Sequence, residues 1–299
     1  MPGLESLNFL NSRYLFLTEP FLKQQGDFRL ISTSSGLSSA VFPFYTEAGR
    51  ILSPVKAPFG SFQFQNEPRP DLVTGILTQL ETLARKEKIH TIQIVLPPDC
   101  YQPEVNVWLQ PLIVSAGYQI VWQDLNFHRE LTTSFETGLH RSERWKLRKS
   151  LQSGYEFRMI LKPDWEFAYR FLLDSRQRKG YQLSMERDDL ERTFQLFPDA
   201  YRMSGVFFED QCVALAVSIQ VNEEMEYVFY TADDVKHRKL SPVVLLHYGL
   251  ANYCREKGAR MLDLGTSSIK GVVNSGVATF KRNLGATASL KSTFQRKFS

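Results

Sequence analysis

The order of predicted elements repeats along this chain of 299 residues, and the repetition restricts the folds available to it. In each half, short strands joined by turns are followed by a helix, a strand, a second helix and a closing strand. Strands that alternate with helices pair into a mixed sheet, which the helices cover. We therefore predict a mixed α/β fold with two related lobes, residues 1–135 and residues 136–299.

In the first half, residues 28–33, 40–49 and 50–56 are predicted as strands, because β-branched and aromatic residues lie between turn residues there. A helix is predicted from Asp71, a good N-terminal cap, because the apolar residues after it keep helical spacing. A strand, a shorter helix that contains Pro111 and an alternating strand complete this lobe.

In the second half, residues 201–210, 211–221 and 224–232 are predicted as an antiparallel meander. Ser241 is the predicted cap of the next helix and Pro242 its first residue, a position that proline favours. The apolar strand MLDLG, a short helix and a closing strand follow, which reproduces the order of the first half.

The composition is that of a globular protein, with 43% hydrophobic and 23% charged residues. No stretch reaches the roughly 18 apolar residues that a membrane-spanning helix needs, and the N-terminus lacks the pattern of a signal peptide. The three cysteines are an odd number without metal-type spacing, which is typical of a reducing compartment. We therefore expect a cytoplasmic protein without a transmembrane segment.

The net charge of +4 is unevenly distributed. Residues 136–299 contain 26 Lys and Arg against 20 Asp and Glu, whereas residues 1–135 contain 10 against 12. Because excess positive charge attracts anions, the second lobe is the one expected to bind an anionic partner.

A basic turn before a helix is the first candidate site. Residues 235–240, VKHRKL, lead into the predicted helix start at Ser241. Free backbone N–H groups, the positive end of the helix dipole and the basic side chains favour a pyrophosphate there. The alternative is a solvated basic turn. The candidate residues are His237, Arg238, Lys239 and Ser241.

Two residues are candidates for proton transfer. Asp263 is a carboxylate in an otherwise apolar strand, where it would act as a general base or orient an amine. Alternatively, it hydrogen-bonds the backbone N–H groups of Thr266 and Ser267. Tyr230, in the strand before the basic turn, is the second candidate.

Cationic side chains supply the remaining candidates. Lys281, next to Phe280, would stabilise negative charge on a carbonyl under attack or hold a phosphate; otherwise it is a solvated lysine beside a core phenylalanine. In HRSERWKLRK, Arg144 and Arg148 align on one helix face that would meet phosphates or simply be solvated. Lys56 lies in the rigid loop SPVKAPFG, which would line a cleft or only shape a turn.

Several common sites are missing from the sequence. It contains no GxxxxGK[ST] phosphate loop, no HExxH, no paired CxxC and no GxSxG elbow, and its five histidines show no ligand spacing. We expect no metal.

The array YVFYTA, basic turn, SPVVLLHYGLANYCREKGARMLDLGTSS and VATFKRNLGA resembles the C-terminal lobe of FemAB-type transferases and their BioF2-like acetyltransferase relatives. HRSERWKLRKSLQSGYEFR resembles the basic helix and strand that open that lobe. The resemblance covers about the last 160 residues. It implies tandem folds of the GCN5-related N-acetyltransferase (GNAT) type, with a degenerate first lobe and an active-type second lobe.

The resemblance also implies where the substrates lie. The acyl donor would lie between the strand that ends at Thr231 and the MLDLG strand, with its pyrophosphate at His237–Pro242. The usual glycine-rich acetyl-CoA loop is replaced here by HRKLSP, which contains no glycine. Lys281 would stabilise the developing charge, with Phe280 lining the cleft, and the coiled-coil arm of some FemAB members is lacking.

We therefore expect an N-acyltransferase in which an acceptor amine attacks the carbonyl of acetyl-CoA or another acyl-CoA directly. The first alternative is an aminoacyl-tRNA donor with a peptidoglycan precursor as acceptor, which the positive second lobe favours. The second alternative is a binding module that has kept the fold and lost the chemistry. The sequence does not specify the oligomeric state.

Overall fold

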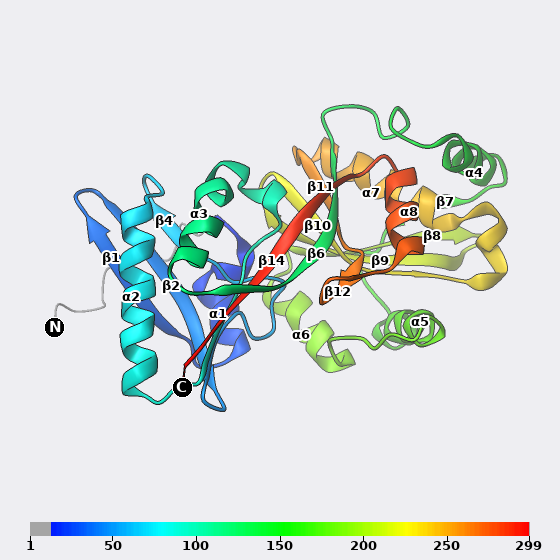
Figure 1. The fold of residues 1–299 in the computed structure, drawn as a ribbon. Coiled ribbons are helices and arrows are strands. Elements are labelled where there is room, and N and C mark those ends of the chain that lie inside the picture. The colour runs from blue at the N-terminus through cyan, green and yellow to red at the C-terminus, as the bar shows by residue number, and fades with distance from the viewer. Residues whose placement is uncertain (1–12, 299) are drawn as a thin grey trace. The chain divides into compact units, whose positions relative to one another are not determined.

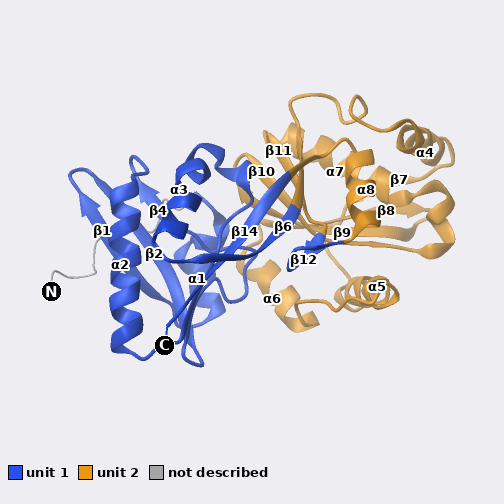
Figure 2. Ribbon diagram, in the orientation of Figure 1, with its two compact units in different colours: residues 1–125, 268–273, 289–299 blue, residues 126–267, 274–288 orange. Residues whose placement is uncertain are grey.

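The computed structural model describes residues 13–298, which form two compact units (Figure 1, Figure 2). Unit 1 is made of the chain up to Leu125, Ser268–Val273 and the C-terminal segment from Ser289. Unit 2 is made of Asn126–Ser267 and Asn274–Ala288. The N-terminus, on which the prediction about a signal peptide rests, lies outside the described residues.

Unit 1 is a mixed sheet on which helices pack. Its helices are α1 (Glu19–Gln25), α2 (Pro70–Lys86) and α3 (Pro103–Ser115), with single 3-10 turns η2 (Leu15–Leu17) and η3 (Asp99–Tyr101). Its strands are β1 (Arg29–Ser35), β2 (Ser38–Glu47), β3 (Arg50–Ser53), β4 (Gln63–Gln65) and β5 (Thr91–Val95), the beginning of β6 (Gln119–Glu130), the hairpin β12 (Ser268–Ile269) and β13 (Val272–Val273), and most of β14 (Thr287–Lys297).

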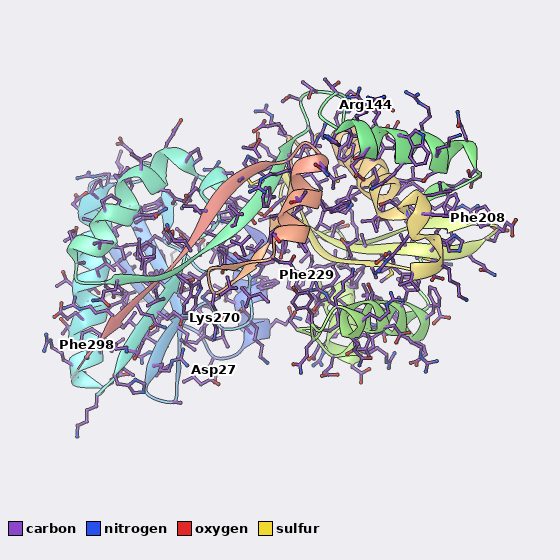
Figure 3. All side chains as sticks on the ribbon, turned by 45° about the vertical axis from the view of Figure 1, so that its right-hand side comes forward. Asp27, Arg144, Phe208, Phe229, Lys270 and Phe298 are labelled. Carbon is purple, nitrogen blue, oxygen red and sulfur yellow. The ribbon has the colours of Figure 1, made fainter. Side chains whose placement is uncertain are left out.

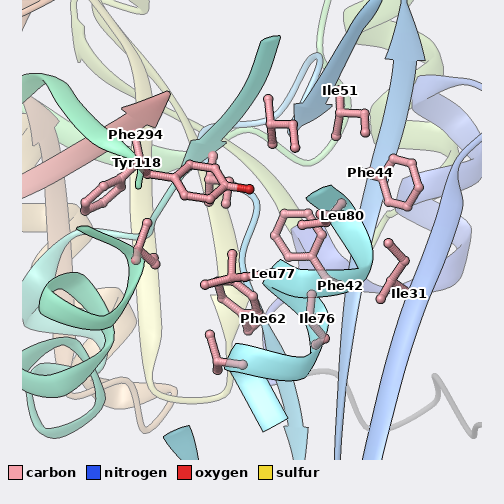
Figure 4. Packing of buried hydrophobic residues seen from close by; sticks show 14 of the residues in the cluster. Ile31, Phe42, Phe44, Ile51, Phe62, Ile76, Leu77, Leu80, Tyr118 and Phe294 are labelled. Atoms are coloured by element: carbon pink, nitrogen blue, oxygen red, sulfur yellow. The ribbon is translucent and has the colours of Figure 1, made fainter. Parts of the chain in front are cut away.

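The core of unit 1 lies between α2 and the sheet, and Figure 4 shows the side chains that fill it. The apolar face of α2 is buried as its spacing predicts, and it packs against phenylalanines of β2. The predicted cap was wrong: α2 begins at Pro70, Arg69 occupies the cap position, and Asp71 pairs with Arg69 across 2.9 Å. A proline at the first helical position is favoured because its missing N–H would have no partner there.

Unit 2 is a second mixed sheet with helices on both faces. Its helices are α4 (Arg141–Gln152), α5 (Trp165–Arg178), α6 (Arg187–Leu196), α7 (Pro242–Glu256) and α8 (Ser275–Asn283), with the 3-10 helix η4 (Val235–Leu240). Its strands are the end of β6, β7 (Glu156–Met159), β8 (Tyr201–Phe208), β9 (Gln211–Asn222), β10 (Met225–Asp233) and β11 (Met261–Thr266).

The sheet of unit 2 has the strand order β6-β11-β10-β9-β8-β7. Only β10 and β11 pair in parallel; every other pair is antiparallel. Helices α5 and α6 lie on one side of β8–β10, and α7 lies on the other (Figure 1). The second lobe therefore has the predicted meander, helix, strand and helix.

The last strand of each predicted lobe contributes to the other unit. Residues Thr293–Lys297 of β14 pair with β5 in unit 1, and the end of β6 pairs with β11 in unit 2, where Asp263 lies opposite His128. The compact units therefore differ from the predicted division at residues 135 and 136, which assigned all of residues 136–299 to the second lobe. Strand propensity predicts that a segment is extended but does not identify its partner.

In unit 1, the parallel pair β3 and β5 is closed along its length. All four residues of β3 have a partner on β5, and beyond them the backbone N–H of Gly60 donates to the carbonyl of Val95 across 2.9 Å. Gly60 belongs to the predicted APFG turn, where a Cβ atom would lie 2.6 Å from the carbonyl carbon of Ser53. This close backbone approach explains the glycine and supports a degenerate first lobe.

Replacing Gly60 with alanine is expected to destabilise the protein by about 2–4 kcal/mol, because the methyl group overlaps the backbone of Ser53. Chemical denaturation measures the change. The control is Gly36→Ala, where a Cβ has open space but φ is +62°, so only about 1 kcal/mol is expected. Equal losses in the two variants would contradict the close approach at Gly60.

Candidate active site

The parallel strands β10 and β11 separate part of the way along unit 2. They pair only from Met225 with Met261 to Tyr227 with Asp263, although β10 continues to Asp233. On its other side β10 stays paired with β9 through Asp233, with register shifts between Met225 and Glu226 and between Val228 and Tyr230. The backbone of β10 after Tyr227 therefore has no strand partner on the β11 side, and a gap opens between the two strands.

Asp263 is the last residue of β11 before the gap, and it is buried, with 2% of its surface exposed. Its Oδ1 accepts hydrogen bonds from Asn126 Nδ2 at 2.9 Å and from the backbone N–H of Gly265 at 2.8 Å. A hydrogen bond with a backbone N–H group that follows Asp263, the alternative role predicted for it, is thus present at Gly265. These donors stabilise the carboxylate and hold the end of β11.

Lys281 is buried at the same end of β11. Its Nζ donates to the carbonyls of Gly265 and Thr266, both at 2.9 Å, so α8 is attached to the strand. The pKa of Lys281 is lowered to about 8, chiefly by burial. The charge of Asp263 opposes this shift, and the charge of Arg176 adds to it. The prediction of a solvated lysine is therefore wrong. Asp263 accepts a hydrogen bond from the N–H of Gly265, and Lys281 donates one to the carbonyl of Gly265. The two side chains are therefore positioned by the same residue.

Gly265 has φ of +75°, which glycine adopts without strain. A Cβ atom there would lie 3.1 Å from the ring of Tyr227, so the strand passes close to this ring.

Tyr230 and Tyr227 lie on one face of the sheet, because their β9 partners Val217 and Ile219 are two residues apart. The hydroxyl of Tyr230 accepts from the backbone N–H of Ser184 at 3.1 Å and lies 2.6 Å from the Ser184 hydroxyl. Burial raises the pKa of Tyr230, so the phenol keeps its proton at neutral pH.

Arg176 of α5 is a residue that the sequence did not indicate. Its guanidinium lies 5.2 Å from the ring centroid of Tyr230, and its charge lowers the pKa of Lys281. Helical spacing alone predicts only that this arginine lies on a partly exposed face of a helix. Nothing in the sequence therefore distinguishes it from its neighbours.

The basic turn is the 3-10 helix η4, which connects β10 to α7. Arg238 Nε donates to the buried carboxylate of Asp233 at 2.8 Å, and Lys179 lies 3.3 Å from the same group. Burial alone would raise the pKa of Asp233, but these two cations hold it below its usual value. His237 Nδ1 lies 2.7 Å from the hydroxyl of Tyr155, and Lys239 is exposed.

Ser241 occupies the predicted cap position of α7, in the left-handed conformation with φ of 47° and without a capping hydrogen bond. Thr231 is partly buried on β10 opposite Ala216, on the face that α7 covers. Phe280 is partly buried, with its ring 6.0 Å from that of His247.

Arg144 and Arg148 lie on the exposed face of α4, and Figure 3 labels Arg144 there. The opposite face of α4 packs on α7 and η4, where the hydroxyl of Ser150 donates to the carbonyl of Leu240 at 2.8 Å. Lys56 is exposed in unit 1, so it is not part of the cluster that unit 2 assembles.

Two further properties concern the described part of the chain. Within residues 13–298, no helix has both the length and the apolar composition that crossing a bilayer requires. In the same range, no group of three or more His, Cys, Asp and Glu side chains is placed to hold a metal ion.

Residues 140–282 match the family model of the acetyltransferase (GNAT) domain. The chain contains a GNAT-type acetyltransferase domain. The match agrees with the predicted class of enzyme, acyltransferase. No curated protein matches the sequence.

Solved structures agree on the fold. FemX has a TM-score of 0.69 at 13% identity, over 97% of this chain and 94% of FemX. The C-terminal domain of a protein described as a lysylphosphatidylglycerol synthetase, from Agrobacterium fabrum, has a TM-score of 0.61 at 14% identity, over 92% and 85% of the two chains. A tandem GNAT protein from the clavulanic acid biosynthesis pathway has a TM-score of 0.51 at 12% identity, over 90% and 83%. The predicted FemAB-like, tandem GNAT fold is confirmed.

The pKa of Lys281 generates a prediction for catalysis. If its ammonium stabilises the transition state, kcat falls as the pH rises through about 8, because the side chain loses its charge there. Lys281→Met is expected to lower kcat by about 100- to 1000-fold at pH 7. A pH–rate profile of acyl transfer is the measurement, with thermal melting to verify folding.

Lys281→Arg provides the matched control, since arginine stays charged to above pH 12. It is expected to remove the decline near pH 8 while keeping more activity than Lys281→Met. An identical alkaline decline in Lys281→Arg would assign the titration to another group.

Proposed function

We propose that the second lobe transfers an acyl group from an acyl-CoA to an amine acceptor by direct attack. The observation that carries this proposal is the end of strand pairing at Tyr227 and Asp263, with the basic η4 and the start of α7 following β10. Beyond this point, backbone N–H and C=O groups of β10 no longer pair with β11. They are available to hydrogen-bond the amide groups and the thioester of an extended donor.

Lys281 is proposed to stabilise the tetrahedral intermediate. Its charge is held at the gap by two carbonyls, so little reorganisation is needed when negative charge develops on the thioester oxygen. In this assignment Asp263 acts as a positioning residue, because it fixes the N–H of Gly265 and attracts the ammonium group.

Tyr230 is proposed to donate a proton to the leaving thiolate. Its raised pKa keeps the phenol protonated, and the N–H of Ser184 holds the oxygen in place. The amine forms the new C–N bond as the C–S bond breaks, and the thiolate leaves with the proton from Tyr230. The nitrogen loses a proton as it becomes an amide, and this proton restores the phenol of Tyr230. Positioning of the two substrates would supply much of the rate acceleration.

The donor's pyrophosphate is proposed to bind at η4 and Ser241. Arg238 is already paired with Asp233, so the exposed Lys239 has more of its charge available. Thr231, the partly buried His237 and Phe280 are proposed to line the donor's path.

A double substitution Arg238→Ala with Lys239→Ala is expected to weaken acetyl-CoA binding about 3- to 30-fold at low salt, because two charges near the diphosphate are lost. Isothermal titration and ligand-induced thermal shift measure the affinity. The matched control, Lys23→Ala with Arg85→Ala, removes two exposed cations from unit 1 and is expected to leave the affinity unchanged. Equal weakening in both would indicate a non-specific charge effect.

A second candidate is an aminoacyl-tRNA donor with a peptidoglycan-precursor acceptor, which the FemAB resemblance implies. The exposed face of α4 favours it, because its arginines have no acidic residue beside them on that face. The one acidic residue of the helix, Glu143, is buried and pairs with Lys146 at 2.8 Å.

Arg144→Ala with Arg148→Ala is expected to weaken binding of bulk tRNA about tenfold at 50 mM salt and to reduce the slope of log affinity against log salt by about 2. Filter binding over a salt series measures both. The control is the double substitution Arg170→Ala with Arg192→Ala, which removes two exposed arginines from α5 and α6 of the same unit. If the wild-type protein binds tRNA no better than this control and its affinity is insensitive to the α4 substitutions, the second candidate is eliminated.

A further inference from the structure

Three side chains form a row across adjacent strands where the gap begins. Tyr227 of β10 is in register with Asp263 of β11, and Asp263 is in register with His128 of β6. Residues in register on neighbouring strands point to the same face of a sheet. The row therefore places an imidazole on the far side of Asp263 from Tyr227.

His128 is buried, with 8% of its surface exposed, and its Nδ1 has no hydrogen-bond partner among the described residues. Buried polar atoms are usually paired, because an unpaired one costs about 1–3 kcal/mol. The two charged groups beside it have partners: Asp263 accepts two hydrogen bonds and Lys281 donates two. The ring nitrogen of His128 is thus an unpaired basic atom next to paired charged groups.

The charges near His128 come from two strands. Asp263 of β11 and Glu130 of β6 both favour its protonated form, but burial outweighs them and lowers the pKa of His128 below its usual value. The imidazole is therefore neutral at pH 7 and able to accept a proton. Neither Lys281 nor Tyr230 can accept a proton in the same way at pH 7, because the lysine is largely protonated and the phenol keeps its proton.

We propose that His128 is the proton acceptor for the attacking amine. This inference rests on the proposed acyl transfer and adds the base that the reaction lacks, since an amine that binds as an ammonium ion must lose a proton before it can attack. The ammonium gives one proton to the free imidazole nitrogen, directly or through one water. The neutral amine then forms the C–N bond and the C–S bond breaks. The thiolate takes the proton of Tyr230, the nitrogen returns its second proton to the Tyr230 phenolate as the amide forms, and the imidazolium releases its proton to solvent after product leaves.

Asp263 has a defined part in this assignment. It lies next to the imidazole in the row and its charge favours the imidazolium that forms, while Asn126 Nδ2 and the N–H of Gly265 donate hydrogen bonds that hold the carboxylate in place. In this proposal the two proton transfers are separate: His128 takes a proton from the β6 side of β11, and Tyr230 gives one from β10.

The test compares wild-type protein with His128→Gln and His128→Asn, using CoA thiol release from acetyl-CoA with a panel of amino-acid amides. For the best acceptor, wild-type kcat is expected to fall as the pH decreases through a value below 6.5, because the base becomes protonated. His128→Gln is expected to lower kcat at least about 100-fold at pH 7 and to lose this acid limb. Circular dichroism and the acetyl-CoA affinity of the variant are expected to match wild type.

His247→Gln is the matched control, since His247 is also buried but its Nδ1 already pairs with the carbonyl of Val243 at 2.8 Å. It is expected to keep the acid limb, even where stability decreases. A purely structural His128 would give a variant with reduced stability and an unshifted pH profile, which would overturn the proposal.

The remaining outcomes separate this inference from the function on which it rests. An active wild-type enzyme with an unchanged His128→Gln profile overturns only the role of His128. Failure of wild type with every amide overturns the proposed acyl-CoA reaction, and the role of His128 with it. A nuclear magnetic resonance titration is independent of activity, and an imidazole of His128 that remains protonated above pH 7 would also overturn the proposal.

Discussion

The early end of pairing between β10 and β11 is the constraint on which the site depends. Beyond Tyr227 and Asp263, the end of β11 pairs only with β6, and Asn126 and Lys281 add side-chain hydrogen bonds to it. The charged side chains that gather at this end, Asp263 and Lys281, are those available to a substrate. In unit 1 the corresponding parallel pair, β3 and β5, stays paired over all four residues of β3.

The order of elements could be predicted because hydrophobic spacing reports on helices and strands directly. The buried face of α2 and the start of α7 at Pro242 are examples. Strand partners could not be predicted, since pairing of β14 with β5 depends on contacts between segments about 200 residues apart. Cap chemistry was also uncertain: Ser241 stands at its predicted position without a capping hydrogen bond, and Asp71 does not cap α2.

The candidate site was predictable to the extent that single residues looked unusual. Asp263 in an apolar strand and Lys281 beside Phe280 were such residues, and the structure places them beside the same glycine, Gly265. Arg176 and His128 gave no such signal, because an arginine on a helix and a histidine in an alternating strand are ordinary in sequence. Their significance depends on the elements packed against them: the ring of Tyr230 lies beside Arg176, and Asp263 lies opposite His128.

The crossing of β6 and β14 between the units affects how the chain can fold during synthesis. Unit 1 contains the first part of the chain, yet its sheet includes Thr293–Lys297 of β14. When the N-terminal segments leave the ribosome, the edge of β5 that pairs with β14 stays unpaired until these residues, about 200 positions later, have been synthesised. Exposed strand edges promote association with other chains. Such a topology would make the nascent first unit dependent on rapid completion of synthesis or on chaperones.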